Sequence, residues 1–208
     1  YTQLSGLGRT TNDHWDNTTF DASGNVTHVG TNKLGRYPVT FAHLYGPTGG
    51  QANGYQYTFM GNSVFCPIMP MNFRWGIDID DSHYGLIQDN VVYNWSGAGI
   101  LTQSGNETGN VIAHNFVVQI THSDIGQLSL SDDDGRVGAA FWFRGFNNYV
   151  RDNVAADAHF SYDYWALGLW KINVPVAQGS DTSVSGQYKT VDMRTFPIAE
   201  FARNEALG

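Results

Sequence analysis

The sequence predicts an all-β chain folded as a right-handed parallel β-helix, a solenoid with long loops. Three observations support this: a recurring asparagine before short apolar strands, a second family of alternating strands, and a low content of charge. Charged residues make up 14% of the 208 residues, whereas 24 residues are glycine and 14% are aromatic. Few charges and many short β-branched runs are typical of a turn-rich β protein.

Five asparagines each open a short strand of small or apolar residues, at intervals of 28, 25, 38 and 51 residues. The shorter intervals suit one coil of a β-helix, and the longer ones indicate a coil with a loop or two coils. An asparagine at a sharp corner can bond local backbone and tolerates the left-handed conformation. Corners stacked about 4.8 Å apart would let the amides hydrogen-bond along the stack. These residues are Asn62, Asn90, Asn115, Asn153 and Asn204.

A second strand family precedes the asparagine corners, with segments at 39–42, 77–80, 100–103 and 141–144. Alternation within each strand sends one set of side chains to the core and the other outward. Parallel stacking would place the outward set in two adjacent ladders on one sheet face. The expected core residues are Phe41, Ile77, Ile79, Ile100, Phe141 and Phe143. The expected outward residues are Thr40, Ala42, Asp78, Asp80, Leu101, Gln103, Trp142 and Arg144.

Three stretches interrupt the repeat and are expected to be loops: 46–54, 121–137 and much of 159–190. Long loops in compact domains are usually functional or mobile. The last stretch carries enough aromatic area to cover a groove or cap the helix. Because Asn204 begins a coil that stays incomplete and solenoids need capped ends, we expect residues 1–208 to be a single β-helix domain within a larger protein. The aromatic residues are Tyr162, Tyr164, Trp165 and Trp170.

Charge and hydropathy exclude several classes of partner. The net charge of −8 argues against a groove for a polyanion over the whole surface, so no nucleic acid partner is expected. An acidic polysaccharide needs only local positive charge. No run approaches the roughly 18 apolar residues of a membrane helix, so this segment is not expected to insert into a membrane. Cys66 is the only cysteine and lies in an apolar run, which predicts a buried, inert thiol.

A series of motifs in order along the chain resembles a known family. The series starts with GRYPVTFAHLYG at Gly35 and continues through 89–94, 97–107, 141–144 and 199–205. In these motifs the chain is similar to the β-helix of the animal cell-migration-inducing hyaluronan-binding protein, its transmembrane hyaluronidase relative and microbial members of the same family. The resemblance implies a parallel β-helix in a carbohydrate context and a secreted or cell-surface location.

The chain departs from this family at polar positions. Relatives tend to carry histidines where Thr40 and Ala42 stand, and His43 lies one step away. They often carry an Ile-His pair near Ile79–Asp80 and a Glu-Asp pair where Gln103–Ser104 stand. The resemblance therefore implies the fold and the carbohydrate context more strongly than it implies catalysis.

The sharpest cluster of candidate site residues is Asp78, Asp80 and Asp81. Asp78 and Asp80 are two apart on one strand, hence on one face with Cα atoms roughly 6.5–7 Å apart. Two carboxylates at that range can act as acid and base across a water molecule, as in inverting glycosidases. With Asp81 they could equally hold Ca²⁺, or form a solvated acidic face beside a turn.

Other candidates adjoin this cluster on the predicted ladders. Arg144 could bind a sugar carboxylate through two hydrogen bonds, Gln103 lies on the same ladder, and Trp142 could stack on a pyranose ring. The alternative for Arg144 is an ion pair with a neighbouring Asp. His43 and His83 follow the outward ladders and could act as acid or base.

The sequence thus predicts an extracellular β-helix that binds a polysaccharide of the hyaluronan or uronate type and is a candidate glycoside hydrolase. One alternative is a non-catalytic carbohydrate-binding or structural solenoid, which the missing His and Glu-Asp residues favour. Another is a metal-dependent polysaccharide lyase, which would need a metal and a Lys or Arg base. Ca²⁺ is the candidate cofactor, and no other cofactor is indicated.

Overall fold

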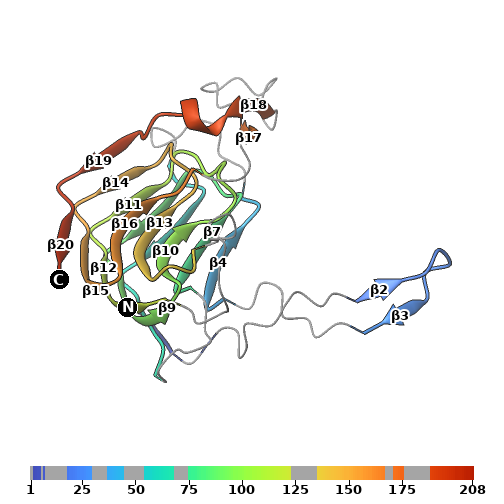
Figure 1. The fold of residues 1–208 in the computed structure, drawn as a ribbon, viewed down its shortest axis with the longest axis horizontal. Helices are drawn as coiled ribbons and strands as arrows, with labels where there is room; N and C mark the ends of the chain where they lie inside the picture. Colours follow the sequence, from blue (N-terminus) through green and yellow to red (C-terminus); the bar gives the residue numbers. More distant parts are fainter. Residues whose placement is uncertain are drawn as a thin grey trace.

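The computed structural model describes residues 2–5, 7, 18–29, 37–44, 54–67, 75–122, 135–166, 171–175 and 188–208. Its body is a stack of coils with three parallel sheets running along it (Figure 1). Every pair of neighbouring strands within these sheets is parallel. The predicted parallel β-helix is therefore confirmed.

Each complete coil passes once through each sheet, so that β7, β8 and β9 form one coil and β10, β11 and β12 form the next. Sheet 1 contains β4 (Val39–Ala42), β7 (Ile77–Asp80), β10 (Ala98–Thr102), β13 (Ala139–Phe143) and β16 (Phe160–Tyr164). Sheet 2 contains β5 (Tyr57–Met60), β8 (Gly85–Gln88), β11 (Val111–Ala113), β14 (Tyr149–Arg151) and β19 (Glu200–Ala202). Sheet 3 contains β1 (Gln3–Ser5), β6 (Ser63–Phe65), β9 (Val91–Ser96), β12 (Phe116–Thr121), β15 (Val154–Ala158) and β20 (Glu205–Leu207).

The predicted asparagine ladder is present at the corner between sheets 2 and 3. The amide nitrogen of Asn90 donates to the side-chain oxygen of Asn115 at 3.0 Å, and Asn115 donates in the same way to Asn153 at 3.0 Å. Asn62 and Asn204 continue the ladder on either side. The residue before each ladder asparagine has positive φ, between 52° and 66°, which shows how sharp this corner is.

A second amide ladder, which was not predicted, lies at the corner between sheets 1 and 2. The side-chain nitrogen of Asn110 donates to the side-chain oxygen of Asn148 at 2.9 Å. The hydroxyl of Tyr57 donates to the Asn110 side-chain oxygen at 2.7 Å and takes the place of a third asparagine. Two corners of the coil are therefore held by stacked polar side chains.

The core lies inside the coils, where side chains from all three sheets meet. Phe41 is half-buried and packs against this core, and Cys66 is buried as predicted. The inward set of the second strand family is therefore confirmed. The other five expected core residues are fully buried: Ile77, Ile79, Ile100, Phe141 and Phe143.

The loop prediction for residues 159–190 is wrong in part. Residues 160–164 form β16, whose Tyr162 stacks on Phe141 in the core with ring centroids 4.9 Å apart. The aromatic residues at every second position of this segment are a strand pattern, and they are the physical reason for the difference from the loop prediction. After β16, β17 (Lys171–Pro175) and β18 (Tyr188–Asp192) form an antiparallel hairpin.

The remaining described elements are short. The 3₁₀ helix η3 (Met193–Thr195) follows β18, and a second antiparallel hairpin, β2 (Thr19–Phe20) with β3 (Val26–His28), lies away from the coils (Figure 1). Most of the other two predicted loops lies outside the described residues, as does Trp170.

Candidate functional site

The outer face of sheet 1 carries the predicted outward row, but part of that row is covered. The strand register places Asp78, Leu101 and Trp142 at equivalent positions in three successive coils. All three are 0% exposed. Leu101 and Trp142 belong to an apolar cluster that also contains Trp75, and Tyr37 packs against this cluster. The direction of these side chains was predicted correctly, but their expected exposure was wrong.

Asp78 is an unusual group for such a place. Among the described residues neither of its carboxylate oxygens has a hydrogen-bond partner, and the same holds for the hydroxyl of Thr40, its neighbour in β4. Burial raises the pKa of Asp78 well above its usual range, and the nearby charges of Asp80 and Glu107 raise it further. Both effects favour the protonated form of Asp78.

One step further along the strands, a second row is partly accessible. The backbone N–H of Gln103 donates to the carbonyl of Ile79 and that of Arg144 to the carbonyl of Thr102, at 2.9 and 3.2 Å. This continues the strand register, so Asp80, Gln103 and Arg144 stand one coil apart in succession. All three are half-buried. We call them the edge row.

Arg144 is held against the buried indole of Trp142. Its guanidinium carbon lies 5.2 Å from the ring centroid, within the range of a cation–π interaction. One guanidinium nitrogen also donates to the carbonyl of Gln103 at 3.4 Å. Trp142, predicted to stack on sugar, is instead fully buried and supports Arg144.

Beyond the edge row, side chains meet where the coil turns from sheet 1 to sheet 2. His43 bonds through Nδ1 to Oδ2 of Asp81 at 3.0 Å, and its side chain is 64% exposed. The side-chain nitrogen of Asn106 donates to Oδ1 of Asp81 at 2.5 Å. The hydroxyl of Ser104 donates to Oδ1 of Asp80 at 2.5 Å. The polar corner is our name for the side chains of His43, Asp81, Ser104, Asn106 and Glu107.

His83 lies beneath the polar corner and is 0% exposed. Its Nδ1 accepts from the backbone N–H of Thr108 at 3.2 Å, and its Nε2 lies 3.6 Å from Oδ1 of Asp81. Burial lowers the pKa of His83 to about 4, although the Asp81 carboxylate opposes that shift. His83 is therefore neutral near pH 7. Its contribution to stability is complete above pH 6.5 and is lost as the pH falls towards about 4.

Glu107 is buried and accepts hydrogen bonds from three backbone N–H groups, those of Asp81, Ser104 and Gly105. Desolvation raises its pKa to about 7, against the opposing effect of those donors. Stability linked to Glu107 is therefore complete below pH 4.5 and declines as the pH rises towards about 7, the opposite direction to His83.

Ser104, Asn106 and Glu107 were not among the predicted site residues. A signal was available, because 103–107 directly follow the strand at 98–102, and in the preceding coil Asp80 ends β7 and Asp81 follows it. Residues at the same ends of neighbouring parallel strands meet at one edge of the sheet.

The three carboxylates proposed to hold Ca²⁺ have separate surroundings. Asp78 is fully buried, Asp80 bonds to Ser104, and Asp81 bonds to His43. Within the described ranges, no three His, Cys, Asp or Glu side chains are grouped so that they could hold a metal ion. Binding of Ca²⁺ by these residues stays a prediction.

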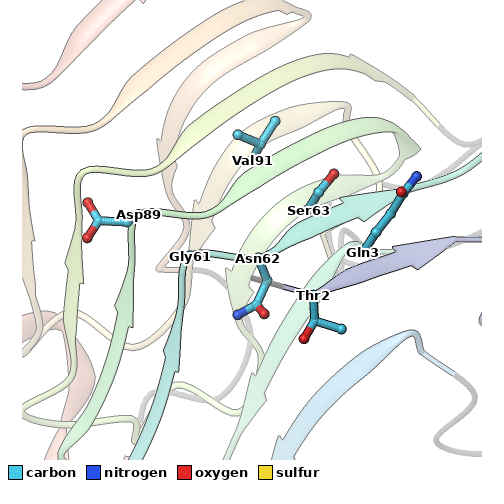
Figure 2. Close-up of a pocket in the computed structure, with 7 residues that line it drawn as sticks. All are labelled: Thr2, Gln3, Gly61, Asn62, Ser63, Asp89 and Val91. Carbon is cyan, nitrogen blue, oxygen red and sulfur yellow. The ribbon is translucent and has the colours of Figure 1, made fainter.

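A cavity of about 380 Å³ lies at the first asparagine of the ladder, at the corner between sheets 2 and 3 (Figure 2). The carbonyl of Thr2 accepts from the N–H of Ser63 there, the same contact that Asn62 makes with Val91 in the next coil. Thr2 thus takes the place of an asparagine. The cavity contains none of the predicted site residues and is lined by Thr2, Gln3, Gly61, Asn62, Ser63, Asp89 and Val91.

Comparison with known proteins places the chain in a family. Curated relatives include fibrocystin-L of Mus musculus and of Homo sapiens, each 32% identical over 141 residues. The aligned region is 67% of this chain but 3% of either relative's length. No solved structure matches the chain. In the part of the chain that the structure describes, none of the helices has the length and apolar character of a membrane-spanning segment. A family model described as the CEMIP beta-helix matches residues 18–208, nearly the whole chain, and the protein therefore belongs to the CEMIP β-helix family.

Proposed function

We propose that this β-helix binds an extracellular polysaccharide of the hyaluronan or uronate class along the edge row and the polar corner. The observation that carries the proposal is the edge row itself, in which an acid, an amide and a guanidinium follow one another on successive coils. The row places one polar side chain on each successive coil along the axis, and a polysaccharide presents one sugar after another along its length. Membership of the CEMIP β-helix family supports the hyaluronan type and a secreted or cell-surface location.

Each side chain of the edge row suits one part of an acidic sugar. The planar guanidinium of Arg144 matches a carboxylate through two parallel hydrogen bonds. The amide of Gln103 can both donate to and accept from hydroxyl groups. Asp80 accepts from Ser104 and can accept from a sugar hydroxyl as well. Asp80 and Arg144 are two coils apart, about 9.6 Å, so a ligand must bridge them.

Arg144→Ala is expected to weaken binding of hyaluronan or polygalacturonate about 10- to 100-fold, because charge-assisted hydrogen bonds contribute about 1.5–3 kcal/mol. Binding of a neutral polysaccharide should change much less. Arg144→Lys should lie between, since lysine keeps the charge without the planar fork. Isothermal titration calorimetry with size-defined oligosaccharides measures the effect. Arg203→Ala, which removes an arginine paired with Asp152 at another corner, is the control. Equal affinity of Arg144→Ala and the parent for acidic sugar would contradict this site.

Hydrolysis of the bound chain is the second candidate function, favoured by two neighbouring acids in different surroundings. Asp78 is buried and its pKa is raised, whereas Asp80 is half-buried and hydrogen-bonded. Such a pair suits a general acid beside a general base. Since Asp78 is fully buried, this role requires the side chains around it to move when sugar binds. The exposed imidazole of His43, oriented by Asp81, is the accessible alternative acid or base.

Asp80→Asn is expected to lower cleavage about 10²- to 10⁴-fold, the usual contribution of a general acid or base, with binding retained. The parent and the variant are incubated with a panel of polysaccharides, with Ca²⁺ or with EDTA, and chain length and ultraviolet absorbance are followed. Shortening without absorbance indicates a hydrolase, new absorbance indicates a lyase, and neither indicates a binding protein. Asp157→Asn, at an exposed position in β15 of sheet 3, is the control. Cleavage by Asp80→Asn at the parent's rate would exclude the Asp78–Asp80 pair as catalyst.

A further inference from the structure

The carboxylate of Glu107 joins two coils at the polar corner. Oε1 accepts from the N–H of Asp81 at 3.1 Å and from that of Ser104 at 2.7 Å, and Oε2 accepts from that of Gly105 at 2.9 Å. Asp81 follows β7, whereas Ser104 and Gly105 follow β10. One buried side chain thus sets the relative position of the turns that end two neighbouring strands of sheet 1.

Each of these turns carries a side chain of the proposed site. The hydroxyl of Ser104 holds Asp80, and the carboxylate of Asp81 holds His43. Gly105 has φ of +92°, and a Cβ built on it would lie 3.1 Å from Cγ of Arg144. A shift of this turn would therefore move its hydrogen bond to Asp80 and its contact with Arg144 together.

The surroundings of Glu107 leave it little freedom to move. A Cβ on Gly145 would lie 2.5 Å from Oε2 of Glu107, so only glycine fits there without displacing the carboxylate. The side-chain nitrogen of Asn148, a member of the second amide ladder, donates to the backbone carbonyl of Glu107 at 2.9 Å. The polar corner is thereby linked to the ladder that holds successive coils in register.

We propose that Glu107 is the positioning residue of the polysaccharide site, holding the turns after β7 and β10 so that Asp80, Asp81 and Arg144 adopt one arrangement. Glu107 does not touch the ligand itself, since it is 1% exposed. This inference rests on the proposed polysaccharide binding at the same site. A ligand that bridges two coils binds more tightly when the side chains that contact it are already in position, and Glu107 is the residue that keeps them there.

Glu107→Gln tests the inference with almost no change in volume. Its oxygen can still accept from Asp81 and Ser104, but its NH₂ group would face the N–H of Gly105, and two donors cannot bond. Affinity for an acidic oligosaccharide is expected to fall about tenfold, as measured by calorimetry. In the Glu107→Gln background, Arg144→Ala should reduce the affinity by a clearly smaller factor than it does in the parent, because the two residues act as a unit. Glu107→Asp, which keeps the carboxylate on a shorter stem, should recover part of the affinity and serves if the Gln variant does not fold.

A merely structural role would give a different result. Val117→Ala, a core truncation in β12, should lower the unfolding temperature without changing affinity and without coupling to Arg144. Additive effects of Glu107→Gln and Arg144→Ala, or parental affinity in Glu107→Gln, would overturn the positioning role while leaving the proposed function intact. A parent that binds no acidic polysaccharide would overturn both.

Discussion

Asn115→Ala is expected to lower the free energy of unfolding by about 4 kcal/mol or more. The Asn115 side-chain oxygen accepts from the backbone and side-chain nitrogens of Asn90, at 3.1 and 3.0 Å. Its nitrogen donates to Asn153 at 3.0 Å and to the carbonyl of Ile87 at 2.9 Å. Truncation removes these four hydrogen bonds, each of which contributes about 0.5–1.5 kcal/mol net, and the loss is larger where a buried group such as the N–H of Asn90 is left without an acceptor. Urea denaturation followed by circular dichroism measures the loss.

Asn204→Ala is the matched control at the end of the same ladder. Asn204 accepts from Asn153 and donates to the carbonyl of Val150, but it is only half-buried, so water can replace part of what is removed. Its truncation should cost about 1 kcal/mol. If Asn115→Ala unfolds at the parent's urea concentration, the amide ladder does not stabilise the corner, and strand pairing alone holds the coils together.

Phe141→Ala is expected to lower the free energy of unfolding by about 3–5 kcal/mol, the usual range for removing a buried phenylalanine. Phe141 is 0% exposed and lies between Ile100 and Tyr162 of the adjacent coils. It stacks on Tyr162 with centroids 4.9 Å apart, so the variant loses a ring contact and leaves a cavity in the centre of the stack. Thermal and urea denaturation both report the change.

Two further variants decide whether the effect of Phe141→Ala comes from the core. Phe141→Leu should cost clearly less than alanine, because leucine fills more of the space. Phe201→Ala, at a side chain that is 48% exposed in β19, should cost no more than about 1 kcal/mol. Equal costs at Phe141 and Phe201 would mean that the side chains of sheet 1 do not form the core.

The sequence by itself determined the parts of the fold that depend on local patterns. A side chain's direction in a strand follows from its parity, so Ile100 and Phe141 could be assigned to the core before any contact was known. An asparagine corner recurs once per coil because each coil needs the same sharp turn there, which made the ladder from Asn62 to Asn204 readable. Family motifs along the chain led to the same architecture.

Only the tertiary structure decided which outward side chains stay accessible. Alternation along the strand sends Asp78 and Trp142 away from the core, but it does not tell whether other side chains cover the outer face of the sheet. Trp75 and Tyr37, which pack in the same apolar cluster as Trp142, belong to no repeated strand. The second amide ladder could not be recognised in the sequence for a related reason, because Tyr57 takes the place of an asparagine in it.

The polar corner required the stacking of coils to be known. His43, Asp81 and Glu107 are separated by 26 to 64 positions, and no spacing rule connects them until parallel strands bring their ends to one edge. Burial then separates residues of like type. His43 is exposed whereas His83 is fully buried. Asp80 is half-buried, whereas Asp78 is fully buried and has no hydrogen-bond partner among the described residues. Exposure to water depends on the packing of distant segments and not on the residue or its immediate neighbours in the sequence.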